Sequence, residues 1–200
     1  MLFLEWEFGN RDFGPIAARI KEAKPDFIWS GVIGLEGNML LDAMKRIDYT
    51  PPMHFYMFPA PGPMAKLPEA NGALAFTTFE DHPPFTNDAR AATFVQAFHE
   101  RGKKAGLFDT SVDLQASIAY TSWQVLEAAV HGAKSLQDKA LAAWLRKSQV
   151  DTIIGRLRWE GQYNYVMGQD LYKVKQLQGG KWQVVWPKVF AAPGAKLIGA

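Results

Sequence analysis

The chain contains no cysteine among its 200 residues. Disulfide bonds, thiolate nucleophiles and thiolate metal ligands are therefore excluded, while the cellular compartment stays open because many exported bacterial proteins also lack cysteine. An excess of one charge is lacking too, since 22 basic and 20 acidic side chains leave a formal net charge of +2. Without a one-sided electrostatic field, we expect no binding to nucleic acid and no attraction to an anionic membrane surface.

Long hydrophobic runs are also missing, and no window approaches the roughly 20 apolar residues of a membrane-spanning helix. Insertion into a membrane is therefore not expected. The first ten residues lack a basic start and a small-residue cleavage site, and Glu5 and Glu7 break their apolar stretch, so they do not form a signal peptide. Hydrophobic residues are nevertheless abundant, at 48% of the chain, which predicts a substantial folded core.

The first 60 residues alternate strand and helix patterns, which is typical of a parallel sheet covered by crossover helices. A two-residue period predicts a strand at the N-terminus, over residues 2–7. A helix from residue 12 to residue 24 follows, and strands at 26–32 and 53–58 flank a helix that carries Leu40 and Met44. The proline-rich segment 59–72 is predicted to be a loop and the best candidate for a crossing between domains.

The later part of the chain is predicted to begin with a strand at 73–79, followed by helices at 87–103, 113–131 and 137–147. The middle helix carries apolar or small residues on nearly every face, so we expect it to be largely buried. From residue 152 the pattern changes to antiparallel strands. The pair Gly179-Gly180 then predicts the turn of a terminal hairpin.

No catalytic, cofactor or metal site is predicted. The glycines at 31, 34 and 37 follow a strand, but their spacing differs from the G-x-G-x-x-G of dinucleotide-binding folds. Ser30 lacks the flanking glycines of a nucleophile elbow. The four histidines lie in different elements, and the cluster Glu80-Asp81-His82 precedes two prolines in a segment typical of a solvated turn.

Four segments of the chain resemble, in order, the branched-chain amino acid and amide binding family of type I periplasmic binding proteins. Residues 12–28 resemble the family's helix followed by its Pro-Asp strand, and residues 113–129 resemble its long buried helix. Residues 152–159 resemble a strand with a glycine step, and residues 180–188 resemble the terminal hairpin. No single segment is diagnostic, but together they cover nearly the whole chain in the family's order.

The resemblance implies an α/β fold of two lobes joined at a hinge, with parallel sheets flanked by helices, in which this chain lacks the N-terminal half. Residues 1–71 are expected in the C-terminal lobe and residues 72–148 in the N-terminal lobe. Residues 149–200 are expected to recross the hinge and to end in the hairpin.

The function that the resemblance implies is that of an extracytoplasmic solute-binding subunit of an ABC importer. Such a subunit is periplasmic, captures a small solute between its lobes, delivers it to the membrane permease of the transporter, and is not an enzyme. The same fold also serves as a ligand-sensing domain of receptors or regulators, and that alternative stays open, because a fold alone does not decide function.

Ligand contacts are expected outside the carboxyl ends of the parallel strands and at the N-terminus of the following helix. One more contact is expected from the start of the helix assigned to the other lobe. The predicted ligand-binding residues are Ile33, Gly34, Glu36, Phe58, Pro59 and Gln115. Leucine-binding members of the family commonly carry a carboxylate where this sequence has Phe58 and Pro59. The sequence therefore predicts that an amide, or an aromatic or aliphatic carboxylate, is preferred to free leucine.

Overall fold

The computed structural model describes residues 1–160, 165–166 and 171–199. The chain divides into two compact units, of which unit 1 comprises Met1–Phe76 and Val174–Ala200 and unit 2 comprises Thr77–Lys173. The terminal hairpin thus belongs to unit 1, whereas residues 149–173 stay in unit 2. The assignment of the chain's parts to particular lobes stays a prediction.

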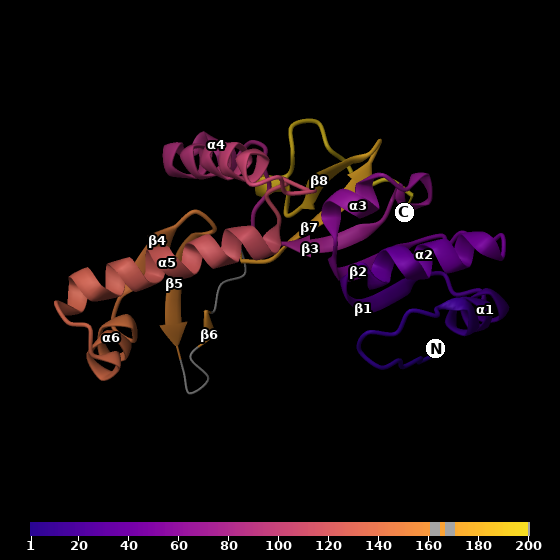
Figure 1. The fold of residues 1–200 in the computed structure, drawn as a ribbon, viewed down its shortest axis with the longest axis horizontal. Coiled ribbons are helices and arrows are strands. Elements are labelled where there is room, and N and C mark those ends of the chain that lie inside the picture. Colours follow the sequence, from indigo (N-terminus) through magenta and orange to yellow (C-terminus); the bar gives the residue numbers. More distant parts are fainter. Residues whose placement is uncertain (161–164, 167–170, 200) are drawn as a thin grey trace. The chain divides into compact units, whose positions relative to one another are not determined.

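Unit 1 is built on a five-stranded sheet with the order β1-β2-β3-β7-β8 (Figure 1). Its first three strands are parallel and its last two form the antiparallel terminal hairpin, as the sequence predicts. The strands are β1 (Ile28–Gly34), β2 (His54–Pro59), β3 (Leu74–Thr77), β7 (Lys173–Gln178) and β8 (Lys181–Trp186). Helix α1 (Gly14–Ala23) precedes β1, α2 (Glu36–Arg46) connects β1 to β2, and α3 (Pro61–Ala65) with a short 3-10 turn at Pro68–Ala70 connects β2 to β3.

The core of unit 1 lies between one face of this sheet and helices α1 and α2. Side chains of β1 alternate between the two faces, so that Ser30 and Val32 are buried while Trp29 and Ile33 are more than half exposed. The buried face meets residues of α2 that recur at helical spacing, including Leu40 and the fully buried Met44. The predicted α/β arrangement of this region is therefore confirmed.

The start of α2 packs closely on the sheet because a glycine stands there. A Cβ atom on Gly37 would lie 2.9 Å from Cε of Met64, 3.1 Å from Cδ1 of Tyr56 and 3.3 Å from Cγ2 of Val32. A side chain at this position would require the side chains of Met64, Tyr56 and Val32 to shift. Gly37 thus has a packing role, and not the phosphate-binding role that glycines have in dinucleotide-binding turns.

The predicted N-terminal strand is wrong, because residues 1–7 have no strand partner in the structure. The two-residue alternation is nevertheless visible in the exposure of the side chains. Leu4 and Trp6 are partly buried against the core, while their neighbours are exposed. The ring of Trp6 lies edge-on to that of Phe13, with centroids 5.5 Å apart. Packing of these side chains holds the segment in place without any backbone ladder, so periodicity alone could not distinguish the two arrangements.

The described part of unit 2 contains three helices and a small antiparallel sheet. The helices are α4 (Ala89–Lys104), α5 (Leu114–Ala133) and α6 (Asp138–Leu145), and a 3-10 turn at Phe85–Asn87 precedes them. The sheet has the order β4-β5-β6, with strands β4 (Gln149–Thr152), β5 (Gly155–Glu160) and β6 (Tyr165–Val166). Carboxylates cap two of the helices: Asp88 accepts hydrogen bonds from the backbone N–H groups of Arg90 and Ala91, and Asp113 accepts one from Ala116.

The expectation that the middle helix is largely buried is also wrong. Within α5 only Leu114, Ser117, Thr121 and Ala129 are buried, and they form a single stripe along the helix. Large apolar side chains on its other faces are exposed, among them Trp123 at 71%. The described elements of unit 2 cover one side of α5, so an all-round apolar sequence here does not correspond to all-round burial.

Candidate functional site

The carboxyl ends of β1 and β2 meet at one edge of the sheet in unit 1. In the parallel register Ile33 lies opposite Phe58 and Gly34 opposite Pro59. The backbone N–H of Ala60 donates to the carbonyl oxygen of Gly34 over 2.8 Å, which extends the pairing beyond the strand ends. Four of the six predicted ligand-binding residues are thereby neighbours, as expected for parallel strands that end together.

A sharp turn after β1 leads directly into α2. Gly34 has a φ of +62°, a left-handed conformation that glycine adopts without steric cost. The buried side chain of Glu36 folds back over this turn, and its Oε2 accepts a hydrogen bond of 3.1 Å from the backbone N–H of Ile33. A carboxylate in the first turn of a helix is favoured by the helix dipole, so Glu36 stabilises both the turn and the helix start.

Two oxygen atoms at the start of α2 have no hydrogen-bond partner among the described residues. They are Oε1 of Glu36 and Oδ1 of Asn38, and both are buried. Buried acceptors in native structures are nearly always paired with protein or water, because leaving one unpaired costs about 1–3 kcal/mol. These two atoms are therefore candidate acceptors for a group that donates hydrogen bonds.

A surface cavity of about 640 Å³ lies at this position. Glu36 and Asn38 contribute to its wall, together with the exposed Ile33 and Leu35. The loop before α1 forms another part of the wall. The remaining lining residues are Phe8, Gly9, Asn10, Arg11, Met39, Asp42 and Leu67.

The predicted site residues are distributed unevenly around this cavity. Ile33 and Glu36 line it, and Gly34 lies between them in the turn. Phe58 and Pro59 are paired with the end of β1, but they are not among the lining residues. Gln115 belongs to unit 2, where it is exposed in the first turn of α5. The role of these six residues in ligand binding stays a prediction.

Sequence reasoning missed the contribution of α2 beyond its first turn. Leu35, Asn38, Met39 and Asp42 recur at intervals of three and four residues, which places them on one face of the helix that begins at Glu36. This spacing was available as a signal once the helix had been predicted. The loop residues 8–11 carried no comparable signal, since only the folded chain brings them beside α2.

The cavity combines an apolar wall with a few polar groups. Ile33, Leu35 and Met39 suit a small apolar body, whereas the unpaired acceptors of Glu36 and Asn38 suit a group that donates hydrogen bonds. Asp42, which also lines the cavity, is paired with Arg46 over 2.5 Å. The sequence-based expectation considered only Phe58 and Pro59 as the place for a carboxylate, whereas the structure puts the carboxylate of Glu36 in the cavity wall.

The titratable pair His54 and Tyr56 is buried in β2 and does not line this cavity. Nδ1 of His54 lies 3.0 Å from the hydroxyl of Tyr56. Burial lowers the pKa of His54 to about 4 and raises the pKa of Tyr56. Both groups are therefore neutral near pH 7 and serve the core of unit 1.

Metal-binding and membrane-spanning features were sought over residues 1–160, 165–166 and 171–199. No group of three or more His, Cys, Asp or Glu side chains within these ranges could hold a metal ion. None of the helices in the same ranges is long and apolar enough to cross a membrane.

Comparison with known proteins gives a consistent result. The family model described as "Periplasmic binding protein" matches residues 5–181. No curated protein sequence matches the chain significantly.

Solved structures of similar fold include a leucine-binding protein from Thermotoga maritima, with a TM-score of 0.69 and 18% identity over 90% of this chain and 49% of that one. A benzoate-bound solute-binding protein of an ABC transporter from Rhodopseudomonas palustris has a TM-score of 0.65 and 19% identity over 96% of this chain and 51% of that one. A type 1 periplasmic binding protein from Bordetella pertussis has a TM-score of 0.70 and 20% identity over 90% of this chain and 50% of that one. These likenesses show the type I periplasmic-binding-protein fold, and the chain spans about half the length of the structures that it matches.

Proposed function

Since this chain belongs to the periplasmic binding protein family, we propose that it is part of an extracytoplasmic solute-binding subunit of an ABC importer. The protein acts in the periplasm, binds its solute without chemical change and passes it to the membrane permease of the transporter. Unit 1 belongs to the C-terminal lobe of the fold and unit 2 to the N-terminal lobe.

The observation that carries this proposal is the cavity at the carboxyl end of β1. Open α/β sheets bind ligands outside the carboxyl ends of their strands, and helix N-termini there present polar groups to the ligand. The cavity has an apolar wall and two buried acceptors without donors, Glu36 Oε1 and Asn38 Oδ1. A solute with an N–H group supplies the missing donors.

The solute is a small amide or amine with an apolar body. An amide N–H₂ group donates two hydrogen bonds, and Glu36 and Asn38 each place one acceptor without a partner among the lining residues, while Ile33, Leu35 and Met39 accommodate the hydrocarbon part. A bare carboxylate has no donor and meets the negative charge of Glu36. An amide therefore satisfies both the structure of the cavity and the sequence-based preference against free leucine.

The test compares benzamide with benzoate, which have the same ring and nearly the same size, by isothermal titration calorimetry of this chain. We expect benzamide to bind at least about tenfold more tightly, because a hydrogen bond to a charged group contributes about 1.5–3 kcal/mol. The substitution Glu36→Gln should reduce this ratio to nearly one. A wild-type chain that binds benzoate more tightly than benzamide would show that Arg11 controls the site, and would contradict the proposal.

A matched control removes a carboxylate elsewhere on unit 1. Glu22 is exposed on α1 and does not line the cavity, so Glu22→Gln should leave both affinities unchanged. Equal effects of Glu22→Gln and Glu36→Gln would indicate a general charge effect and not a contact in the cavity.

A further inference from the structure

Two charged side chains in the cavity beside α2 have no ion-pair partner. Of the residues that line this cavity, Arg11, Glu36 and Asp42 carry a charge, and Asp42 is paired with Arg46. Neither Arg11 nor Glu36 makes an ion pair with any residue that the structure describes, and they are therefore beyond ion-pair distance of each other. The cavity thus offers one free cation and one free anion to a solute.

Hydrogen bonds on both sides of Arg11 hold the loop that carries it. The side-chain amide of Asn10 donates to the carbonyl oxygen of Asp12 over 2.8 Å and accepts from the backbone N–H of Asp12 over 3.2 Å. The carboxylate of Asp12 in turn accepts a bond of 3.0 Å from the backbone N–H of Gly14, where α1 begins. The side chains of Asn10 and Asp12 thus bond within the loop, whereas the guanidinium of Arg11 remains available to the cavity.

A simple neutral amide would leave this guanidinium without a partner. A dry cavity of about 150 Å³ is enough to hold benzene, so a cavity of about 640 Å³ has room for a solute with a further polar group. The donors of an arginine form a rigid planar fork, which matches the two oxygen atoms of a carboxylate. A carboxylate is therefore the group that suits the Arg11 end of the cavity.

We infer, as an extension that rests on the proposed amide-binding function, that the solute is the monoamide of a dicarboxylic acid and that Arg11 selects its carboxylate. The amide end donates to Glu36 and Asn38, and the carboxylate at the other end accepts from Arg11. The hydrocarbon part between them lies against the apolar wall. Because Arg11 and Glu36 are separated, the carboxylate of the solute does not have to approach that of Glu36.

The experiment compares two ligands of nearly equal shape that differ in charge. In 4-carbamoylbenzoate the amide stands opposite a carboxylate, and in 4-nitrobenzamide it stands opposite a neutral nitro group. Affinities for this chain are measured by isothermal titration calorimetry, and the two 3-substituted isomers are measured in parallel. In at least one of the two pairs we expect the carboxylate to bind about threefold to tenfold more tightly than its nitro counterpart, because only the carboxylate forms charge-assisted hydrogen bonds with Arg11.

Substitutions of Arg11 assign this preference to one side chain. Arg11→Gln removes the charge and should bring the ratio of the two affinities to about one, whereas Arg11→Lys keeps the charge without the fork and should retain part of the preference. Arg19 is exposed on α1 and does not line the cavity, so Arg19→Gln is the matched control and should leave the ratio unchanged. Equal effects of Arg11→Gln and Arg19→Gln would overturn the inference, since they would indicate a general charge effect.

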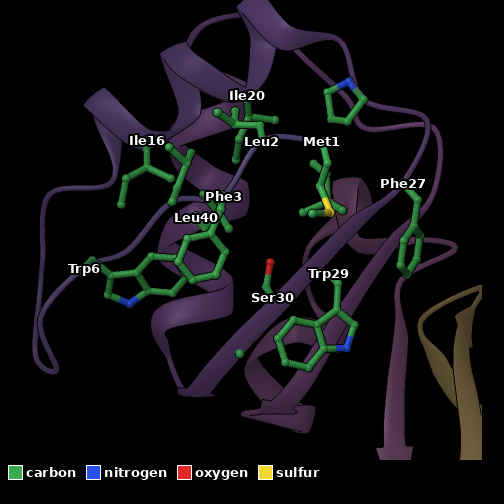
Figure 2. A pocket seen from close by; sticks show the side chains of 14 residues that line it. Met1, Leu2, Phe3, Trp6, Ile16, Ile20, Phe27, Trp29, Ser30 and Leu40 are labelled. Carbon is green, nitrogen blue, oxygen red and sulfur yellow. The ribbon is translucent and has the colours of Figure 1, made fainter.

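An apolar cavity beside residues 1–6 and β1 is another place for an aromatic ring (Figure 2). Its lining shares no residue with the cavity beside α2 and contains no Asp, Glu, Lys or Arg side chain, but it includes Met1, whose amino group attracts a carboxylate. Binding there would be insensitive to Arg11→Gln and weakened by Ile16→Trp, which fills that space. A preference for the carboxylate that shows this response would contradict the role of Arg11.

Failure of this inference is distinguishable from failure of the proposed function. If the nitro compounds bind but neither carboxylate binds more tightly than its nitro counterpart, the amide site stands and the assignment of Arg11 is wrong. If none of the four compounds binds, the amide site itself is wrong and the inference fails with it.

Discussion

Helix α2 in unit 1 buries six of its eleven residues, whereas the longer α5 in unit 2 buries four of its twenty. Helix α5, which is less buried than α2, is the one with the better N-terminal cap. The N-cap residues of α1 and α2, Phe13 and Leu35, make no side-chain capping hydrogen bond, and α1 has only a bond from the N–H of Gly14 to Asp12, while the N-cap carboxylates Asp88 and Asp113 cap α4 and α5. Unit 1 thus holds its helices by packing them on a sheet, and unit 2 depends more on interactions within each helix. The relative weight of packing and capping can be measured by substitutions matched between the units.

The largest expected difference concerns one leucine in each unit. Leu40 of α2 is 1% exposed and Leu126 of α5 is 43% exposed. We expect Leu40→Ala to lower the free energy of unfolding of unit 1 by about 2–5 kcal/mol, because it leaves a cavity in the core. Leu126→Ala should cost unit 2 less than about 1 kcal/mol.

This comparison is measured by urea titration followed through amide NMR signals that belong to each unit, since the two units need not unfold together. Equal losses for the two substitutions would mean that the exposed face of α5 is covered in solution. Sedimentation of the wild-type chain would then show self-association.

A smaller difference is expected in the response of the units to acid. Because the pKa of buried His54 is about 4 in the folded chain against 6.5 for an ordinary histidine, the unfolded chain binds this proton first as the pH falls. The contribution of neutral His54 to the stability of unit 1 is therefore fully present above pH 6.5 and is lost as the pH falls from 6.5 to 4. The slope is at most about 1.4 kcal/mol per pH unit.

Substituting the histidine itself isolates this effect. In His54→Gln the free energy of unfolding, measured by urea titration from pH 7 to 4, should lose that slope. His131 is exposed on α5, and His131→Gln serves as the control in unit 2. A slope that persists in His54→Gln would assign the acid response of unit 1 to other groups.

The smallest expected effect concerns the caps of unit 2. Oδ1 of Asp113 accepts a hydrogen bond of 2.7 Å from the backbone N–H of Ala116 at the start of α5. Asp113→Ala should destabilise unit 2 by about 1 kcal/mol, as is typical when a capping side chain is lost. Asp113→Asn keeps the acceptor and should preserve most of the stability. If both variants lose the same amount, the negative charge matters more than the hydrogen bond.

Much of unit 1 could be predicted from local sequence patterns. The alternation of Ile28, Ser30 and Val32 with exposed neighbours, and the helical spacing of Leu40 and Met44, are expressed directly in burial. Such periodicities are set by backbone geometry, so they survive in the folded chain. The ends of β1 and β2 followed from the same patterns, which is why Ile33 and Glu36 could be placed near a cavity before the structure was known.

The tertiary structure decided two features that local sequence patterns leave open: the conformation of the N-terminal segment and the exposure of α5. Alternation at residues 2–6 is compatible both with a strand and with an unpaired segment, and only the packing of Trp6 on Phe13 and the free edge of β1 distinguish them. The apolar faces of α5 are likewise compatible with burial or exposure, depending on which elements lie beside the helix.

The sequence by itself determined the order of elements, the parallel core of unit 1 and the family, because each depends on periodicity or on short strings of residues. Only the folded chain decided which polar atoms lack partners. Glu36 Oε1 and Asn38 Oδ1 have no partner among the described residues because of the side chains that surround them, some of which come from distant parts of the sequence. The cavity beside α2 depends on long-range contacts of this kind, because loop residues 8–11 line it together with α2, and no local pattern encodes them.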